Sequence, residues 1–114
     1  MNYLKSERPK QPGSSGYLIA DVLDIRDEAL YSDYRSGVSP GLHEAGGAYL
    51  VRGGFVRVLE GTWAPKRIVV ARFRSVDEVV RWWESPEYEP LKRMRQKATI
   101  SNIICIEGST EEPG

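Results

Sequence analysis

The sequence predicts an α+β domain in which two helices cover one face of a four-stranded antiparallel sheet. Three observations lead to this prediction. The 114 residues match the length of a single domain. Runs rich in β-branched residues are separated by amphipathic segments in the order strand, helix, strand, strand, helix, strand. Two of the strand runs are apolar on both sides of the pleat, as expected of a sheet that is covered on both faces.

The first half of the chain predicts a strand followed by an interrupted helix. Residues 17–25 form a near-continuous apolar run and predict a central strand. Asp27 is placed to cap the helix that follows, whose apolar residues recur at helical spacing as far as Leu42. The Ser39-Pro40 pair predicts that this helix breaks and restarts, because proline lacks the donor that a continuing helix needs.

The second half predicts three strands and one helical region. Residues 48–59 predict a strand interrupted at Gly53-Gly54, and residues 67–73 predict the next one. Ser75 and Glu78 have the spacing of a capping box, in which the hydroxyl accepts one amide and the acid accepts another. The helix that follows has a second start at Ser85-Pro86 and ends near residue 97. Residues 99–107 predict the last strand.

This order is the split βαβ arrangement of ferredoxin-like folds. A monomer would leave one apolar sheet face in water, so we expect two copies to pair sheet against sheet as a homodimer with the form of a dimeric α/β barrel. The folded domain is predicted over residues 17–108. Residues 1–16, rich in Lys, Pro, Gly and Ser, predict a flexible arm, and residues 109–114 predict a flexible tail.

Composition restricts the functional classes. Sixteen basic side chains balance sixteen acidic ones, so no basic field would attract nucleic acid or an anionic membrane. The one cysteine, Cys105, excludes an intramolecular disulfide, and no apolar run has the length of a signal peptide or a membrane span. No spacing of a metal site is present. We expect a cytoplasmic protein without a metal, a cofactor or a nucleic-acid partner.

Several short motifs resemble a known family when they are taken in order. They are Gly46-Gly47 with Leu50, Arg52-Gly53-Gly54, Glu60-Gly61, Phe73-x-Ser75, Trp82-x-x-Ser85-Pro86-Glu87-Tyr88 and Arg95. Together they resemble domain of unknown function 1330, a family of the dimeric α/β-barrel superfamily, over residues 17–108. The resemblance implies the ferredoxin-like fold and a barrel-shaped homodimer. It implies no particular activity, since wider relatives include cofactor-free monooxygenases, muconolactone isomerase and haem-handling enzymes.

The chain departs from the family at polar positions. It has Ala48 where the family usually has a basic residue after the glycine pair, and Ala45 where an aromatic residue or histidine usually precedes it. It has Arg72-Phe73-Arg74 where the family commonly has an acid, Phe and Pro. These departures imply that the ligand of this member differs from that of its relatives.

Three aromatic residues and one arginine are the leading candidates for a ligand site. Tyr34, Trp82 and Tyr88 would line a pocket between the helices and the sheet, or else form part of the core. Arg95 lies seven residues after Tyr88 and so on the same helical face. Its guanidinium would bind a carboxylate of the ligand, or else pair with a surface acid such as Glu84, Glu87 or Glu89.

Three further residues carry open alternatives. His43, the only histidine, is a candidate general base, or a cation that stabilises the end of the helix. Arg52 is a second candidate ligand contact, or a charge that protects an edge strand from aggregation. Asp21, the polar residue of the first strand, would face the dimer interface, pair with Arg72 or reach the pocket.

Two hypotheses of function follow. The first is a small-molecule-binding homodimer, a candidate cofactor-independent enzyme acting on a small anionic or aromatic organic compound. Tyr34, Trp82 and Tyr88 would frame its pocket, and Arg95 would position the anionic group. The second is a non-enzymatic structural or regulatory dimer whose residues serve packing alone. An inter-helix cavity filled by side chains would favour the second hypothesis.

Overall fold

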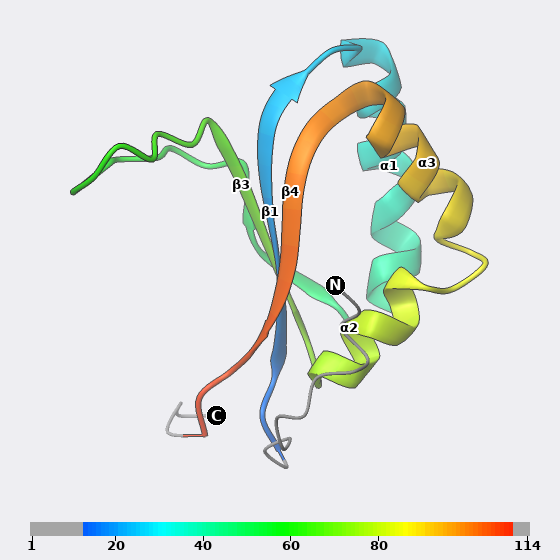
Figure 1. Ribbon diagram of the computed structural model, residues 1–114. Coiled ribbons are helices and arrows are strands. Elements are labelled where there is room, and N and C mark those ends of the chain that lie inside the picture. Colours follow the sequence, from blue (N-terminus) through cyan, green and yellow to red (C-terminus); the bar gives the residue numbers. More distant parts are fainter. Residues whose placement is uncertain (1–12, 111–114) are drawn as a thin grey trace.

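The computed structural model describes residues 13–110 as a four-stranded sheet with helices on one side of it (Figure 1). Along the chain the elements are β1 (Gly16–Ile25), α1 (Glu28–Glu44), β2 (Ala48–Arg52), β3 (Arg67–Phe73), α2 (Val76–Trp83), α3 (Glu89–Ala98) and β4 (Thr99–Glu107). The strand order is β2-β3-β1-β4 and every neighbouring pair is antiparallel. The predicted ferredoxin-like fold is confirmed, with the second helical region divided into α2 and α3.

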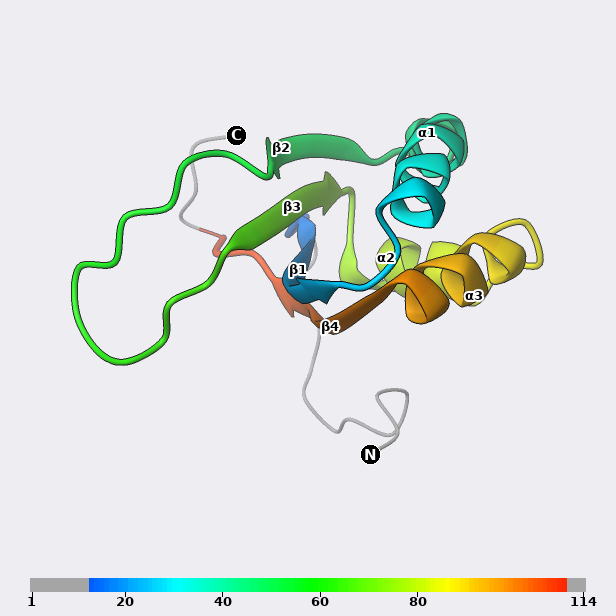
Figure 2. The same ribbon diagram turned by 90° about the horizontal axis from the view of Figure 1, so that it is seen from above.

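The core lies between the inner face of the sheet and the helices, which all lie on one side of the sheet in Figure 2. Strand alternation decides which side chains face inward. Leu18 of β1 pairs with Ala71 and Cys105, and Ala20 pairs with Val69 and Ile103, so these residues share one face of the sheet. The buried cluster on that face consists of Val38, Leu42, Ala71, Phe73, Val79, Trp82 and Tyr88.

The predicted break at Pro40 is wrong, because α1 is a single helix with Pro40 inside it. A proline in a helix removes one donor and disturbs the preceding turn. The carbonyl that loses its amide donor to Pro40 is that of Ser36, four residues earlier. Val38 and Leu42, on either side of the proline, are both buried. Burial of the same helical face on both sides of the proline therefore keeps the helix continuous.

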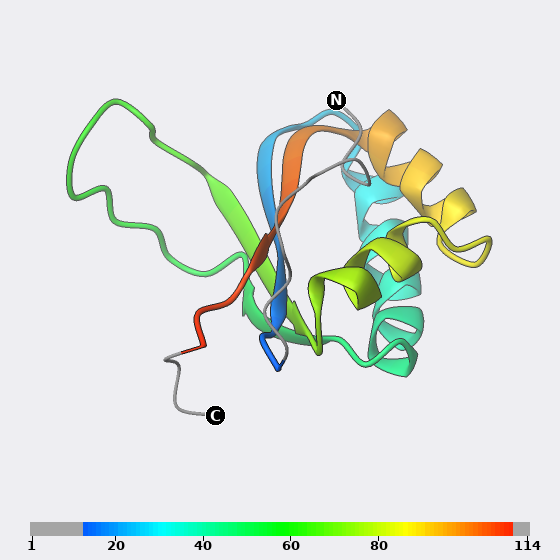
Figure 3. The same cartoon turned by 60° about the horizontal axis from the view of Figure 1, so that its bottom comes forward.

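The predicted second strand is too long at its C-terminal end. β2 stops at Arg52, and its register against β3 shifts between Tyr49 and Val51. Gly53 follows with φ +75°, a conformation that glycine adopts without strain and that ends the extended backbone. Residues 53–66 then form an irregular loop that extends away from the helices (Figure 3).

The N-terminus of α2 confirms half of the predicted capping box. The Ser75 hydroxyl accepts a hydrogen bond from the Glu78 amide at 3.1 Å. The Glu78 carboxylate accepts from Arg81 at 2.7 Å instead of completing the box. Gly16 lies directly against the Ser75 backbone, where a Cβ atom would collide. The start of β1 and the start of α2 are therefore packed backbone to backbone.

The outer face of the sheet carries exposed apolar residues, as the sequence predicts. Ile104 and Ile106 of β4 are 56% and 49% exposed. Loop residues 53–66 add Phe55, Leu59 and Trp63, and the indole of Trp63 donates to the Asp21 carboxylate at 2.9 Å. No helix covers this face among residues 13–110 (Figure 1).

The predicted domain limits fall partly outside the described residues. Of the predicted arm 1–16, residues 1–12 lie outside them, and Gly16 already belongs to β1. Of the predicted tail 109–114, residues 111–114 lie outside them.

Candidate functional site

A cavity of about 40 Å³ lies between the inner face of the sheet and the helices. Its walls come from every strand and every helix, and most of its lining side chains are apolar or aromatic. We call it the inner cavity. The aromatic residues that line it are Tyr31, Tyr34, Tyr49, Trp82, Trp83 and Tyr88.

Tyr34 and Tyr88 meet at the inner cavity through their hydroxyl groups. The two oxygens are 2.9 Å apart and form a hydrogen bond. Tyr88 is 2% exposed and packs against Trp82, with ring centroids 4.1 Å apart. Burial, followed by the proximity and the hydrogen bond of Tyr88, raises the pKa of Tyr34 far above its ordinary value. Tyr34 is therefore a neutral phenol that can donate or accept in the hydrogen bond with Tyr88.

Four arginines line the inner cavity, and no Asp or Glu is among its lining residues. Arg67 Nε donates to the Tyr31 hydroxyl at 2.9 Å. Arg52 donates to a carbonyl of α1 and lies over the Tyr49 ring, 4.2 Å from its centroid. These guanidinium groups are held by protein acceptors and aromatic faces, and they give the cavity a positive surround.

Arg95 differs from the other cavity arginines in being buried. It lies in the last turn of α3, it is 6% exposed, and its Nε is buried without a hydrogen-bond partner among the described residues. Its guanidinium carbon is 5.6 Å from the centroid of the Trp83 ring. The acid at the start of α3, Glu89, pairs instead with Lys92 and Arg93. Burying a cation without a counter-ion costs free energy unless a bound anion pairs with it.

The structure separates the predicted site residues into two groups. Tyr34, Trp82, Tyr88 and Arg95 meet at the inner cavity, which Arg52 also lines. His43 does not line it: its side chain is exposed in the last turn of α1 and packs edge-to-face on Tyr49, with centroids 6.0 Å apart. The cavity thus offers hydrogen-bond donors and positive charge but no base that titrates near neutral pH.

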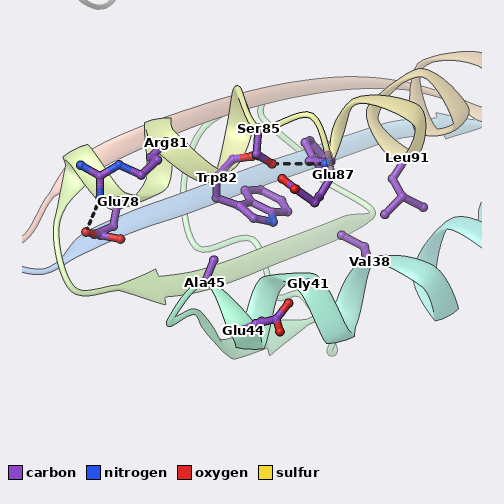
Figure 4. Close-up of a pocket in the computed structure, with 11 residues that line it drawn as sticks. Val38, Gly41, Glu44, Ala45, Glu78, Arg81, Trp82, Ser85, Glu87 and Leu91 are labelled. Carbon is purple, nitrogen blue, oxygen red and sulfur yellow. Dashed lines mark hydrogen bonds and ion pairs between the residues drawn. The ribbon is translucent and has the colours of Figure 1, made fainter.

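A wider groove of about 300 Å³ lies beside the inner cavity between α1 and α2 (Figure 4). Val38, Trp82 and Tyr88 line both spaces. The charged residues of this groove are Glu44, Glu78, Glu87 and Arg81, and Arg81 is paired with Glu78. Figure 4 shows Trp82 and the Arg81–Glu78 pair on the α2 wall, with Glu44 and Ala45 on the opposite wall. We call it the acidic groove.

A third space of about 420 Å³ opens between α3 and β4. Trp83, Arg95 and Ile103 line both this groove and the inner cavity. Its charged lining residues are Arg26 and Arg95, with Gln96, Thr99 and Ser101 as polar neighbours. We call it the basic groove. The inner cavity therefore lies between two grooves of opposite charge.

Sequence reasoning missed several cavity residues. Tyr31 lies one helical turn before Tyr34, and Trp83 directly follows Trp82, so both were within reach of the periodicity argument. Arg67 begins β3 and lies on the same face as Val69 and Ala71, so strand alternation would have placed it inward. An arginine at an inward-facing strand position is therefore the sequence signal that would have predicted Arg67 as a cavity residue.

Residues 13–110 contain neither a cluster of metal ligands nor a membrane-spanning helix. No group of three or more His, Cys, Asp or Glu side chains is placed to hold a metal ion. No helix of this part of the chain is long and apolar enough to cross a membrane.

Comparison with known proteins identifies the family. The model of the family described as Domain of unknown function (DUF1330) matches residues 15–109. The chain belongs to this family. No curated protein matches the chain at a significant level. The DUF1330 assignment agrees with the motifs found in the sequence and with the observed strand order.

Solved structures share the fold of this DUF1330 protein. A protein of unknown function from Rhodopseudomonas palustris aligns with a TM-score of 0.68 and 20% identity over 82% of each chain. A hypothetical protein from Arabidopsis thaliana aligns with a TM-score of 0.60 and 13% identity, over 95% of this chain and 96% of that one. A protein from Nitrosomonas europaea, described as a candidate antibiotic biosynthesis monooxygenase, aligns with a TM-score of 0.52 and 7% identity, over 94% of this chain and 100% of that one.

Proposed function

We propose that this protein binds a small organic anion in the inner cavity, with Arg95 holding its carboxylate. The observation that carries the proposal is the buried Nε of Arg95, which has no acceptor among the described residues. A carboxylate oxygen would accept a charge-assisted hydrogen bond from this Nε. The Tyr34–Tyr88 pair offers a second donor, and the aromatic walls would pack against the rest of the ligand.

The same donors would support a cofactor-independent reaction. Positive charge and a phenolic proton stabilise negative charge that develops on a carbonyl oxygen of a bound molecule. The cavity lacks a base that titrates near neutral pH, so a reaction that removes a proton from the substrate would have to release that proton to water. The monooxygenase description of one neighbour fits such chemistry, although a likeness at 7% identity speaks only for the fold.

The test measures the binding of short carboxylates, either by calorimetry or from the rise in thermal stability that they cause. Butyrate should bind the wild type, and Arg95→Gln should weaken binding by roughly tenfold or more, since a hydrogen bond to a charged group contributes about 1.5–3 kcal/mol. Arg93→Gln is the matched control, because Arg93 is exposed on the same helix and pairs with Glu89. Equal affinities for the two variants would refute the site.

We also propose that two copies pair through the outer face of the sheet. The support is the apolar surface on that face, including Leu50, Ile104 and Ile106, each about half exposed in the single chain. Covering it with a second copy would remove apolar area from water at about 25 cal/mol per Å². A two-fold axis through the face would leave both inner cavities on the outside of the pair.

The alternative is a structural or regulatory dimer without a ligand. The small cavity volume favours it, and so does the hydrogen bond by which Tyr34 and Tyr88 satisfy each other. Native mass spectrometry of the untagged protein separates the two. A dimer that retains a stoichiometric small acid supports the binding function, whereas an empty dimer that no carboxylate stabilises supports the structural role.

A further inference from the structure

The two grooves on either side of the inner cavity differ in charge. The acidic groove carries Glu44, Glu78 and Glu87 against the single cation Arg81. The basic groove carries Arg26 and Arg95, and no acid is among its lining residues. An anion is repelled at the first opening and attracted at the second. The side from which an anionic ligand reaches Arg95 is therefore decided by charge.

Arg26 is held close to the C-terminal end of α3, which also carries Arg95. The backbone amides of Arg26 and Asp27 both donate to the carbonyl of Ala98, at 2.7 and 3.2 Å. Ala98 is the last residue of α3, three positions after Arg95. The Arg26 side chain is exposed and forms no ion pair with another described residue. It is free to meet a ligand in the basic groove.

We infer that Arg26 and Arg95 form one carboxylate site at the boundary between the basic groove and the inner cavity, and that the ligand is a short monocarboxylic acid bound with its hydrocarbon end inward. This inference rests on the proposed function and adds the direction of binding, the second cation and the ligand class. Arg26 attracts and contacts the carboxylate from the side of the groove, and the buried Nε of Arg95 donates a hydrogen bond to it.

The volume of the inner cavity limits the hydrocarbon end. A cavity of about 40 Å³ has room for roughly three water-sized groups, since each needs about 10–15 Å³. The apolar side chains nearest the boundary are Trp83 and Ile103, which line both spaces. A chain of three carbons fits, whereas a second carboxylate at the inner end needs more room than a methyl group, and Arg52 and Arg67 already donate to protein acceptors.

Calorimetric titrations with acetate, butyrate, hexanoate and succinate test the inference on the full-length protein. Butyrate should bind most tightly, and succinate roughly tenfold or more weakly, because its second carboxylate is larger than the methyl group of butyrate and the inner cavity is small. Arg26→Gln should raise the Kd of butyrate by roughly threefold to tenfold and reduce its dependence on salt. Arg81→Gln removes the same charge from an exposed arginine of the acidic groove and should change the Kd by less than about twofold.

Distinct results would overturn the inference and the proposed function. If butyrate binds and Arg95→Gln weakens it, but Arg26→Gln behaves as Arg81→Gln does, the ligand does not enter by the basic groove and the inference fails alone. Succinate binding more tightly than butyrate would likewise refute the inward hydrocarbon end. If no carboxylate binds the wild type, the proposed function fails with it.

Discussion

The hydroxyl groups of Tyr34 and Tyr88 are 2.9 Å apart although the two residues are 54 positions apart in the sequence. Their hydrogen bond joins α1 to the turn before α3 across the inner cavity. Tyr88 is almost fully buried, so its hydroxyl has little access to water if Tyr34 is changed. The same hydrogen bond therefore stabilises the domain and positions two of the residues that line the candidate site.

We expect Tyr34→Phe to lower the free energy of unfolding by about 1–3 kcal/mol, because it leaves the buried Tyr88 hydroxyl without its partner. The Tyr34→Phe/Tyr88→Phe double variant should lose less than the sum of the two single changes, since no orphaned hydroxyl remains. Urea unfolding of the four proteins measures the coupling. Strict additivity would mean that the hydrogen bond contributes nothing.

Alkaline pH should destabilise the protein through Tyr34. Burial raises the pKa of Tyr34 above its ordinary value of 10.0, so its contribution is fully present below pH 10. Above pH 10 the unfolded chain releases the phenolic proton and the folded chain keeps it, so stability falls as pH rises, by up to about 1.4 kcal/mol per pH unit for one group. The slope should be smaller in Tyr34→Phe. Identical slopes between pH 10 and 11 would contradict the assignment.

Replacement of Arg95 by methionine should separate stability from binding. The change removes a buried cation whose Nε lacks an acceptor and keeps most of the side-chain volume. We expect the free energy of unfolding to stay equal or to rise by about 1 kcal/mol, while carboxylate binding is lost. Chemical denaturation together with calorimetry checks both. A loss of stability above about 2 kcal/mol would assign Arg95 a structural role.

A charge placed on the outer face of the sheet should dissociate the proposed homodimer. In Ile104→Asp a carboxylate would be buried between the two sheets, at a cost of several kcal/mol. Ser36→Asp adds the same charge at an exposed position of α1 and should leave the dimer intact. Analytical ultracentrifugation distinguishes the two masses. An Ile104→Asp dimer as stable as the wild type would place the interface elsewhere.

The sequence predicted the fold well wherever a local signal agreed with the tertiary contacts. β3 and β4 have their predicted limits, and Asp27 and Ser75 cap their helices as predicted. The prediction at Pro40 was wrong because Val38 and Leu42, on either side of it, are both held in the core by residues of other elements. Such long-range compensation is invisible to a local argument.

The candidate site was predicted in part. The helical spacing placed Tyr88 and Arg95 on one face, and both line the inner cavity. Spacing within one helix could not show that Tyr34 bonds to Tyr88, nor that Arg95 lacks a partner, because both facts depend on how the helices pack. Arg26 carried no sequence signal, since its place beside α3 is made by a backbone bond to Ala98.

Equal numbers of acidic and basic residues make the chain neutral, yet the two grooves beside the inner cavity differ in charge and set up a local field between them. Hydroxyl groups orient in such a field. Tyr88 also lines the acidic groove, so in the empty protein we expect Tyr34 to donate to Tyr88. An anion beside Arg95 opposes that field, and the Tyr34 hydrogen would turn toward it while Tyr88 becomes the donor. Arrival of a ligand would thus reverse the sense of a hydrogen bond without moving a heavy atom.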